Sequence, residues 1–375
     1  MIFSINFFSK LAFILLISIF CLSECVLVKK NPPENFQIGK QELRIAVLPA
    51  ENLSGTPVPL KKIKASIIEK LKGQGLSVLE GDELDKFMAL YRVRYTGGID
   101  AATAEAFKKE IGVNAVLITS VELYNETTPS KVALISRLVS TGGNPVILWM
   151  DSVGLSGDDS PGILNTGLIE DYNLLLDKAI ESLNASLRRY LSESRGMLST
   201  KKNRKFLAPK ISYNISFINP DKKYAVAVIP FFNDSTRKNS GEIIMLHFVM
   251  QMMKLKNFDV IEPGVIRQEL LKMRIIMDAG ISLSDADLIL NGLNADLMLS
   301  GRVMGYDDYI GSFGKTKVDF SVQLLNKEGK KVVWASKSYS EGDDRVFLFD
   351  WGKINTANAM ASEMVRIAVD SMVKQ

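Results

Sequence analysis

Cysteine and histidine are almost absent from this chain of 375 residues. The two cysteines, Cys21 and Cys25, lie near the amino terminus, and His247 is the single histidine. The remainder of the chain therefore has no disulfide and no thiol chemistry. Most histidine-based metal sites are excluded, as is every Ser-His or Cys-His catalytic pair that does not use His247.

Common catalytic and phosphate-binding motifs are also missing. The sequence has no Walker loop, no Gly-x-Gly-x-x-Gly, no His-Glu-x-x-His and no Gly-x-Ser-x-Gly. The acidic pairs Asp158-Asp159, Asp307-Asp308 and Asp343-Asp344 lack the alternating oxygen ligands of a calcium loop, so we interpret them as ordinary loops. We predict no enzymatic activity, no metal and no cofactor. A glycan hydrolase that uses two carboxylates alone is the enzymatic alternative, because such a pair needs only proximity in the fold.

A strong charge of one sign is missing as well. Hydrophobic residues make up 47% and charged residues 23% of the chain, which is typical of a globular protein, and the net charge is only +4. Basic residues do not gather on one predicted element, so we expect no nucleic acid partner. The stretch 192–223 is basic, and we interpret it as a solvated linker; contact with anionic lipid is the alternative.

The pattern of the amino terminus is typical of an export signal. Lys10 precedes a mostly apolar run, Leu11 to Leu22, which is too short for a finished membrane span and fits the core of a signal peptide. The run ends in Leu22-Ser23-Glu24-Cys25, which resembles a bacterial lipobox, with Glu24 where a small residue is usual. We expect 1–24 to be a signal peptide and 25–43 a lipid anchor and tether, with Cys25 lipidated. The alternatives are an ordinary cleaved signal peptide and an uncleaved anchor.

One short pattern occurs twice and organises the rest of the chain. Arg44–Pro49 is an apolar run that ends in proline and is followed by Asn52 and Ser54. Ala225–Pro230 is the same kind of run and is followed by Asn233 and Ser235, at a spacing of 181 residues (230 − 49 and 233 − 52). Each run predicts a buried central strand, and each Asn-x-Ser predicts a turn that leads into a helix.

Later features repeat in the same order. Gly112-Val113-Asn114-Ala115 is echoed at 292–295, and Trp149 is echoed by Trp334. We therefore predict a duplicated α/β (α+β) domain with a mixed five-stranded sheet and flanking helices, at 44–195 and 224–375 with a linker at 196–223. Apolar residues at helical spacing predict closing helices at about 163–191 and 354–373.

The order of these motifs resembles a set of bacterial envelope domains: the N-terminal domain of TolB, LpoB and CsgG. The residues that carry the resemblance are Ile45–Pro49, Asn52, Ser54, Gly112–Ala115 and Trp149, with their second copies. The resemblance implies a mixed sheet with helices that is used for protein contacts rather than for catalysis. The strand connections are too short for the membrane hairpins of a secretion pore of the CsgG kind.

These observations favour a cell-envelope lipoprotein that acts as an adaptor or assembly subunit in envelope biogenesis or export. We expect it to face the periplasm, and Val26 favours the outer membrane because it is not an aspartate-type retention signal. Its partners would be other envelope proteins. A homo-oligomeric ring of an export apparatus is the alternative. Residues considered for partner contact are Asn52, Asn233, Trp149 and Trp334, although turn formation and core packing are the simpler interpretations.

Overall fold

The structure is a computed structural model that describes residues 43–79, 81–159, 167–192, 207–215, 218–275, 280–309, 314–344 and 353–373. The predicted signal peptide, the lipidation of Cys25, the tether up to residue 42 and residues 196–206 of the linker lie outside the described residues. We call residues 43–192 the first half and residues 207–373 the second half.

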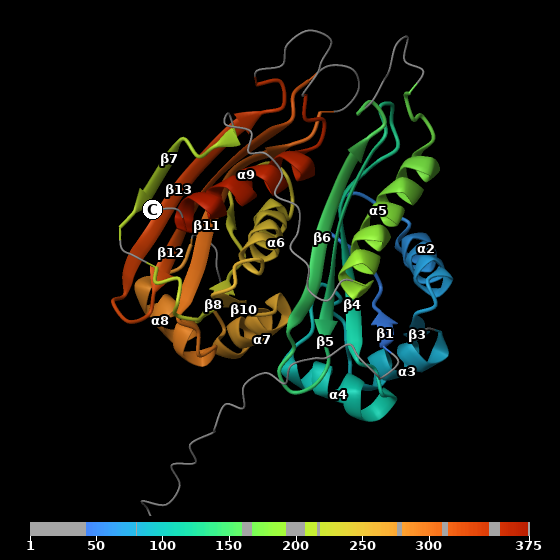
Figure 1. Cartoon of the computed structure of the whole chain (residues 1–375), viewed down its shortest axis with the longest axis horizontal. Helices are drawn as coiled ribbons and strands as arrows, with labels where there is room; N and C mark the ends of the chain where they lie inside the picture. Colours follow the sequence, from blue (N-terminus) through green and yellow to red (C-terminus); the bar gives the residue numbers. More distant parts are fainter. Residues whose placement is uncertain are drawn as a thin grey trace, which may run out of the picture. The chain divides into compact units, whose positions relative to one another are not determined.

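The first half is built on a mixed sheet with strand order β3-β1-β4-β5-β6, and the short β2 lies beside β4. Strand β1 pairs in parallel with β3 and β4, while β4, β5 and β6 form an antiparallel meander. Helices α2 and α5 cover one face, and α3 and α4 cover the β1 end of the other face (Figure 1). The elements are β1 (Arg44–Val47), β2 (Glu51–Asn52), α2 (Leu60–Gly73), β3 (Ser77–Leu79), α3 (Asp82–Leu90), α4 (Ala101–Ile111), β4 (Ala115–Asn125), β5 (Lys131–Ser140), β6 (Ile147–Ser156) and α5 (Tyr172–Ser192).

The second half repeats this order. Its sheet runs β10-β8-β11-β12-β13-β7, with the short β9 beside β11. Helices α6 and α9 pack on one face, and α7 and α8 cover part of the other face (Figure 1). The elements are β7 (Ile211–Asn214), β8 (Tyr224–Val228), β9 (Phe232–Asn233), α6 (Ser240–Met252), β10 (Phe258–Val260), α7 (Pro263–Met273), α8 (Leu283–Gly292), β11 (Leu297–Asp307), β12 (Lys317–Asn326), β13 (Lys331–Glu341) and α9 (Ala357–Val373).

The two sheets share their register, including its irregularities. Ile45 lies opposite Ala115 in the first sheet, as Val226 lies opposite Leu297 in the second. The ladder shifts between Val121 and Leu123 in β4, and it shifts at the corresponding place in β11. A second shift follows Leu138 in β5 and recurs in β12. The strands can therefore be matched residue by residue, and the predicted α/β fold with two copies of one sheet-and-helix unit is confirmed.

Local chemistry explains where α4 begins and ends. The carboxylate of Asp100 accepts a hydrogen bond from Thr103 N at 2.8 Å and so caps α4, and Gly112 ends that helix in the left-handed region at φ 61°. The predicted apolar stripe of α5 is buried at every position. The stripe consists of Tyr172, Leu175, Leu176, Ala179, Ile180, Leu183 and Leu187.

Both closing helices begin later than the sequence predicts. Helix α5 begins at Tyr172, because Ile169 N donates to Gly157 O at 2.9 Å and holds the preceding segment against the end of β6. In the second half, Ile354 N donates to Gly342 O at 3.0 Å, and α9 begins at Ala357. Residues 163–166 of the predicted first helix lie outside the described residues.

The predicted linker contains structure that its composition did not reveal. Residues 211–214 form β7, which pairs antiparallel with β13 and extends the second sheet, and Leu207 is fully buried. The sheets thus have six and seven strands when β2, β9 and β7 are counted, rather than the five predicted. The reason is that β7 is short and its residues are exposed, so it lacks the apolar run by which strands are recognised.

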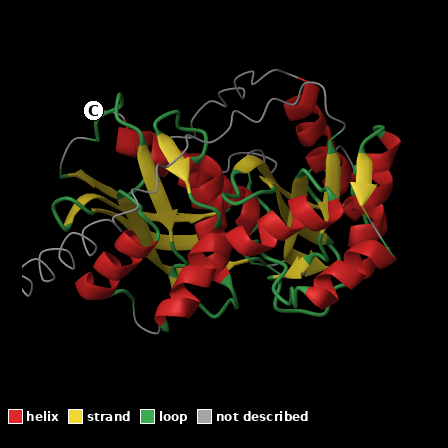
Figure 2. Ribbon diagram, turned by 90° about the horizontal axis from the view of Figure 1, so that it is seen from below, coloured by secondary structure: helices red, strands yellow, loops and turns green. Residues whose placement is uncertain are grey.

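Helices flank the strands in both halves (Figure 2). Within the described ranges, none of the helices combines the length and the apolar character needed to span a bilayer. The largest buried cluster combines α6, α9 and the second sheet with four residues of the first half, namely Leu53, Ile135, Ile147 and Met150. The core is therefore shared between the halves.

Candidate functional site

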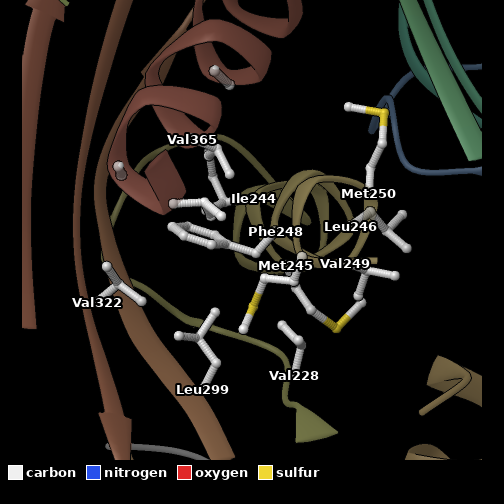
Figure 3. Close-up of a cluster of buried hydrophobic side chains, with 14 of the residues drawn as sticks. Val228, Ile244, Met245, Leu246, Phe248, Val249, Met250, Leu299, Val322 and Val365 are labelled. Carbon is white, nitrogen blue, oxygen red and sulfur yellow. The ribbon is translucent and has the colours of Figure 1, made fainter. Parts of the chain in front are cut away.

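Helix α6 is apolar on every side. All of its residues from Ser240 to Met252 except Glu242 are buried, including His247. Figure 3 shows Phe248 and Met245 on the side of Leu299 and Val322 of the second sheet, whereas Leu246 and Met250 leave the opposite side of the helix. That opposite side packs against the first half, and α9 likewise contacts β6. Each fully buried side chain of this size contributes roughly 1.5–3 kcal/mol. We call this contact the interhalf interface.

A buried ion pair crosses the interhalf interface. Arg137 of β5 is 1% exposed and Glu262 is 0% exposed. The guanidinium donates from Nε to Oε2 at 3.2 Å and from Nη2 to Oε1 at 3.0 Å, which is a two-pronged contact, and Nη2 also donates to the carbonyl of Gly97. Glu262 also caps α7 by accepting from Gly264 N. The pair is satisfied from several directions, as a buried ion pair must be.

Glycines let the two backbones meet beside this pair. A Cβ on Gly264 would lie 2.3 Å from the backbone nitrogen of Ile99, and a Cβ on Gly98 would lie 2.8 Å from Cα of Gly264. Further along the interface, a Cβ on Gly154 would lie 2.6 Å from the side-chain oxygens of Thr356 and Asn358. No larger residue fits at these positions without a shift of the backbone or of α9.

The single histidine belongs to the same interface. His247 Nε2 lies 3.6 Å from Oε2 of Glu122, and both side chains are buried. Asn358 Nδ2 donates to the same carboxylate, and Arg237 Nη2 donates to the backbone carbonyl of Glu122. His247 is therefore packed inside the protein, and it joins α6 to β4 of the first half.

A third polar contact lies at the far end of β5. The ammonium of Lys131 donates to the carbonyl of Tyr309 at 2.8 Å and lies 2.9 Å from the centre of its ring. Burial lowers the pKa of Lys131 to about 8. The hydroxyl of Tyr309 donates to Asp158 at 2.9 Å, and Asn355 donates to Asp159 at 3.1 Å. The Asp158-Asp159 loop is therefore used to hold the second half.

Two neighbouring carboxyl groups complete the interface. Burial, and then the negative charge of Glu242, raise the pKa of Glu51 to about 7. Ser120 donates to Glu51 at 2.7 Å, and Tyr95 donates to Glu242 at 3.1 Å. The guanidinium of Arg267 lies 4.2 Å from the centre of the Tyr95 ring. A carboxyl with a pKa near neutrality can act as a general acid or base, but here both carboxyls are held by side chains of the interface.

The structure places Asn52 and Asn233 in matching turns, and Asn233 Oδ1 also accepts a hydrogen bond from Ser240 Oγ at 2.6 Å. Each side-chain oxygen accepts from the backbone and hydroxyl of the serine two residues later, at 2.7–3.0 Å. Each side-chain nitrogen donates at 2.7 Å to a carbonyl four residues later, that of Thr56 or of Arg237. The two asparagines thus fix the chain between the central strand and the following helix, and a contact with a partner stays a prediction.

The two repeated tryptophans are core residues. Trp149 is 6% exposed and Trp334 is 0% exposed. The indole nitrogens donate at 3.3 Å to Ser186 and Ser212 respectively, so each polar edge is satisfied inside the chain. The four residues considered from the sequence lie in separate turns and cores rather than in one site, and a role in binding stays a prediction.

The face of the first sheet that α6 covers has an equivalent face on the second sheet, and that face forms a groove. The groove has a volume of about 730 Å³ over the face of the second sheet opposite to α6 and α9. Its floor comes from β11, β12 and β13, and its walls from β7 and the segment before α8. The lining residues are Ile211, Tyr213, Ile229, Pro230, Phe232, Gly280, Ile281, Ser282, Ser300, Gly301, Arg302, Ser321, Val322, Gln323, Ala335, Ser336 and Lys337.

The groove floor is polar and basic. The shared register matches Ser321, Gln323 and Ala335 in the floor with Ile135, Arg137 and Met150 of the first sheet, which are buried under α6, α7 and α9. Arg302 and Lys337 are the cations of the groove, and Arg302 forms an ion pair with Asp234. Among the lining residues, none is a carboxylate. The groove is thus suited to a polar partner surface with exposed carboxylates.

Sequence reasoning missed both the interhalf interface and the groove, although two signals were present. Arg137 and Glu122 interrupt otherwise apolar strands, which indicates a buried polar contact. The run Ile243–Met253 is apolar around the whole helix, which is typical of a helix buried on all sides rather than of a surface helix. The groove itself had no signal, because its floor reads as an ordinary solvated sheet face.

No family model and no curated protein sequence matches the chain. Solved structures do align with parts of it. The PelC dodecamer from Paraburkholderia phytofirmans aligns with 13% identity and a TM-score of 0.29 over 42% of this chain and 94% of that chain. Lipoprotein GNA1162 from Neisseria meningitidis aligns with 21% identity and a TM-score of 0.28 over 41% of this chain and 99% of that chain.

The C-terminal domain of LpoB from Salmonella enterica also aligns, with 13% identity and a TM-score of 0.24, over 32% of this chain and 83% of that chain. LpoB is one of the proteins that the sequence motifs resemble. Each of these three alignments spans less than half of this chain.

Proposed function

We propose that this protein is a non-enzymatic lipoprotein of the bacterial cell envelope that binds another envelope protein in the groove of its second sheet. The lipobox-like segment that ends in Cys25 supports the anchor. The protein would then face the periplasm from the outer membrane. The observation that carries the binding role is the difference between the two sheets: the same face is filled by α6 and α9 in the first half and forms a groove in the second half.

The groove has features that protein-binding surfaces share. Its walls expose apolar and aromatic side chains, with Ile211 44% and Tyr213 62% exposed, while its floor offers hydroxyl, amide and cationic groups. An apolar rim around polar contacts is suited to an amphipathic helix pair, since a helix pair already fills the equivalent face of the first half. The lining predicts a partner segment with carboxylates that meet Arg302 and Lys337.

The buried charges support an adaptor rather than a catalyst. Arg137, Glu262 and Lys131 are nearly or fully buried, and each is held by a partner across the interhalf interface. Their role in this proposal is to fix the two halves as one rigid support for the groove. Such a support limits the entropy that a binding surface loses when a partner docks.

Site-specific photocrosslinking in the native envelope tests this function. A benzophenone amino acid at Gln323 places the reactive group in the groove floor, and the same amino acid at Lys62 places it on the exposed surface of α2. We expect a discrete adduct of higher mass from position 323 and none from position 62. No adduct at 323, or the same adduct at both positions, would contradict the proposal.

The anchor needs a separate test. Radioactive palmitate should label the unmodified chain, and Cys25→Ser should abolish the label while leaving the remainder of the chain folded. Unchanged labelling of Cys25→Ser would remove the lipoprotein assignment. It would leave the groove prediction untouched, because the two rest on different residues.

A further inference from the structure

Strand β7 ends the second sheet and leaves one edge without a neighbour among the described strands. All of its residues are exposed, and three of the large exposed apolar residues fall in this one short stretch. Ile211 is 44%, Tyr213 62% and Ile215 62% exposed. An uncovered edge strand with an apolar row is a template for pairing with another strand.

The direction of the free backbone groups follows from the pairing with β13. Tyr213 lies opposite Ala335, and Ile215 N donates to Val333 O at 2.8 Å. In an antiparallel ladder the backbone groups of alternate residues point toward the same neighbour. The groups of Tyr213 and Ile215 therefore point toward β13, and those of Ser212 and Asn214 point toward the free edge.

We propose that a second copy of this chain pairs with this edge, β7 against β7 in antiparallel orientation, with the two-fold axis at Tyr213. Ser212 then exchanges two backbone hydrogen bonds with Asn214 of the second copy, and the symmetric exchange adds two more. Tyr213 faces Tyr213 of the second copy, and Ile211 faces Ile215 of the second copy. The two seven-stranded sheets become one continuous sheet, which is an isologous dimer.

The residue pattern of β7 favours a second copy of this chain as the pairing strand. Ile211-Ser212-Tyr213-Asn214-Ile215 has the same polarity pattern when it is read from either end. Antiparallel self-pairing about the central tyrosine therefore sets apolar against apolar and polar against polar, with no charged residue in the paired segment. An unrelated strand would need to match this pattern, whereas a second copy matches it by symmetry.

Side chains of β7 that point toward α9 hold the strand in an extended conformation. Ser212 Oγ accepts from Trp334 Nε1 at 3.3 Å, and Asn214 Nδ2 donates to Ser371 O of α9 at 3.4 Å. These contacts fix β7 as an extended strand before any partner arrives, which lowers the entropy lost on pairing. The dimer goes beyond the proposed groove function, because it uses the backbone edge of β7 rather than the groove floor.

Disulfide trapping tests the register. In the full-length chain with Cys21 and Cys25 replaced by serine, Tyr213→Cys is the sole thiol. Directly opposed residues that are not hydrogen-bonded place their Cβ atoms about 4.5–5.5 Å apart, which is close to the distance a disulfide needs. We expect most of the chain to become a covalent homodimer under mild oxidation. Leu174→Cys, which replaces a 50% exposed residue of α5, should stay monomeric.

Backbone substitution tests the edge without a new thiol. Asn214→Pro removes an N–H that points away from β13, so the intramolecular ladder is kept while the pairing between copies is lost. We expect light scattering to give twice the monomer mass for the unmodified chain and the monomer mass for Asn214→Pro. Tyr213→Lys should have the same effect, because it places two ammonium groups opposite each other while its exposed position leaves the fold intact.

Several outcomes would overturn the dimer. One is a monomer mass for the unmodified chain at all concentrations; another is trapping at position 213 that is no faster than at position 174. A dimer that persists in both Asn214→Pro and Tyr213→Lys, with unchanged unfolding midpoints, would place the contact elsewhere. Because Tyr213 also lines the groove, an adduct of Tyr213→Cys with a different envelope protein would contradict the dimer only if it formed in place of the covalent homodimer.

Discussion

Helices α2 and α6 occupy equivalent places in the two halves and differ in their outer surfaces. At the repeat spacing, Lys62, Ala65 and Glu69 of α2 correspond to Ile243, Leu246 and Met250 of α6. The three residues of α2 are exposed, and those of α6 are at most 1% exposed. The sheet faces differ in the complementary way: the face that receives α6 is apolar and charge-paired, and the equivalent face of the second sheet is polar.

This difference explains why a third copy of the unit cannot pack against either end of the pair. The interhalf interface uses one helix pair and one sheet face. The helix surface left at one end is charged, and the sheet face left at the other end is polar, so a further copy cannot repeat the same contact. Polar outer surfaces on terminal units serve this purpose in repeat proteins. The groove therefore lies on the sheet face that corresponds to the helix-binding face of the first half, but with polar side chains in place of the apolar ones.

The largest expected change in the free energy of unfolding comes from replacing the buried Arg137 by glutamine, the residue at the equivalent position of the second sheet. Arg137→Gln gives the first sheet the residue that the second sheet has at the equivalent position, and it leaves Glu262 buried without its ion pair. We expect the free energy of unfolding to fall by about 3–5 kcal/mol, measured by urea denaturation. Gln323→Arg, the reverse exchange in the groove, should change it by less than about 0.5 kcal/mol. Equal effects of the two exchanges would contradict the difference between the faces.

The helices offer a second exchange. Met250→Glu gives α6 the residue of α2 and buries a carboxyl group against the first half, at an expected cost of about 3 kcal/mol. Glu69→Met gives α2 the residue of α6 on an exposed surface and should cost less than about 0.5 kcal/mol. Thermal unfolding of the two variants in parallel measures both values. A Met250→Glu variant as stable as the unmodified chain would mean that α6 is not covered by the first half.

Glu51 predicts a dependence on pH that its counterpart Phe232 cannot have. The pKa of Glu51 is raised from 4.5 to about 7, so the folded state binds a proton that the unfolded state has released between these values. The stability of the unmodified chain should therefore fall as pH rises from 4.5 to 7, by at most about 3 kcal/mol. Glu51→Gln should remove this part of the slope and be relatively more stable at pH 8 than at pH 4. Denaturation curves across this range measure it, and a slope unchanged by the substitution would contradict the assignment.

The smallest expected effect is also the most symmetric. Asn52→Ala and Asn233→Ala each remove the hydrogen bonds that the two turns share, and Asn233→Ala also removes the bond that Asn233 Oδ1 accepts from Ser240 Oγ. We expect each to lower the free energy of unfolding by about 1–2 kcal/mol, with the value for Asn233→Ala larger by no more than about 1 kcal/mol because of its additional hydrogen bond. Chemical denaturation of the two single variants is sufficient. A large effect at only one position would show that this asparagine has a further role.

The fold could be predicted because its determinants are local and occur twice. The central strands, the Asn-x-Ser turns, the Asp100 cap and the stripe of α5 all follow from residue types within a few positions of one another. The interhalf interface could not be predicted in the same way. Arg137 and Glu262 are 125 residues apart, and the sequence around one does not identify the other as its partner.

The groove was hidden for a different reason. Its floor is recognisable only by comparing Gln323 with Arg137 and Ser321 with Ile135, and that comparison needs the register of two sheets with bulges at matching places. β7 was missed because a short exposed strand has the composition of a loop. Features that depend on which surface stays uncovered are set by the assembled chain rather than by any one segment.

The apolar outer surface of α6 has a consequence for the order of synthesis. During synthesis and during export, β5 and β6 emerge well before Ser240, so Ile135 and Met150 are not yet covered by α6 and α9. A nascent chain truncated after Ser192 should therefore be prone to aggregation.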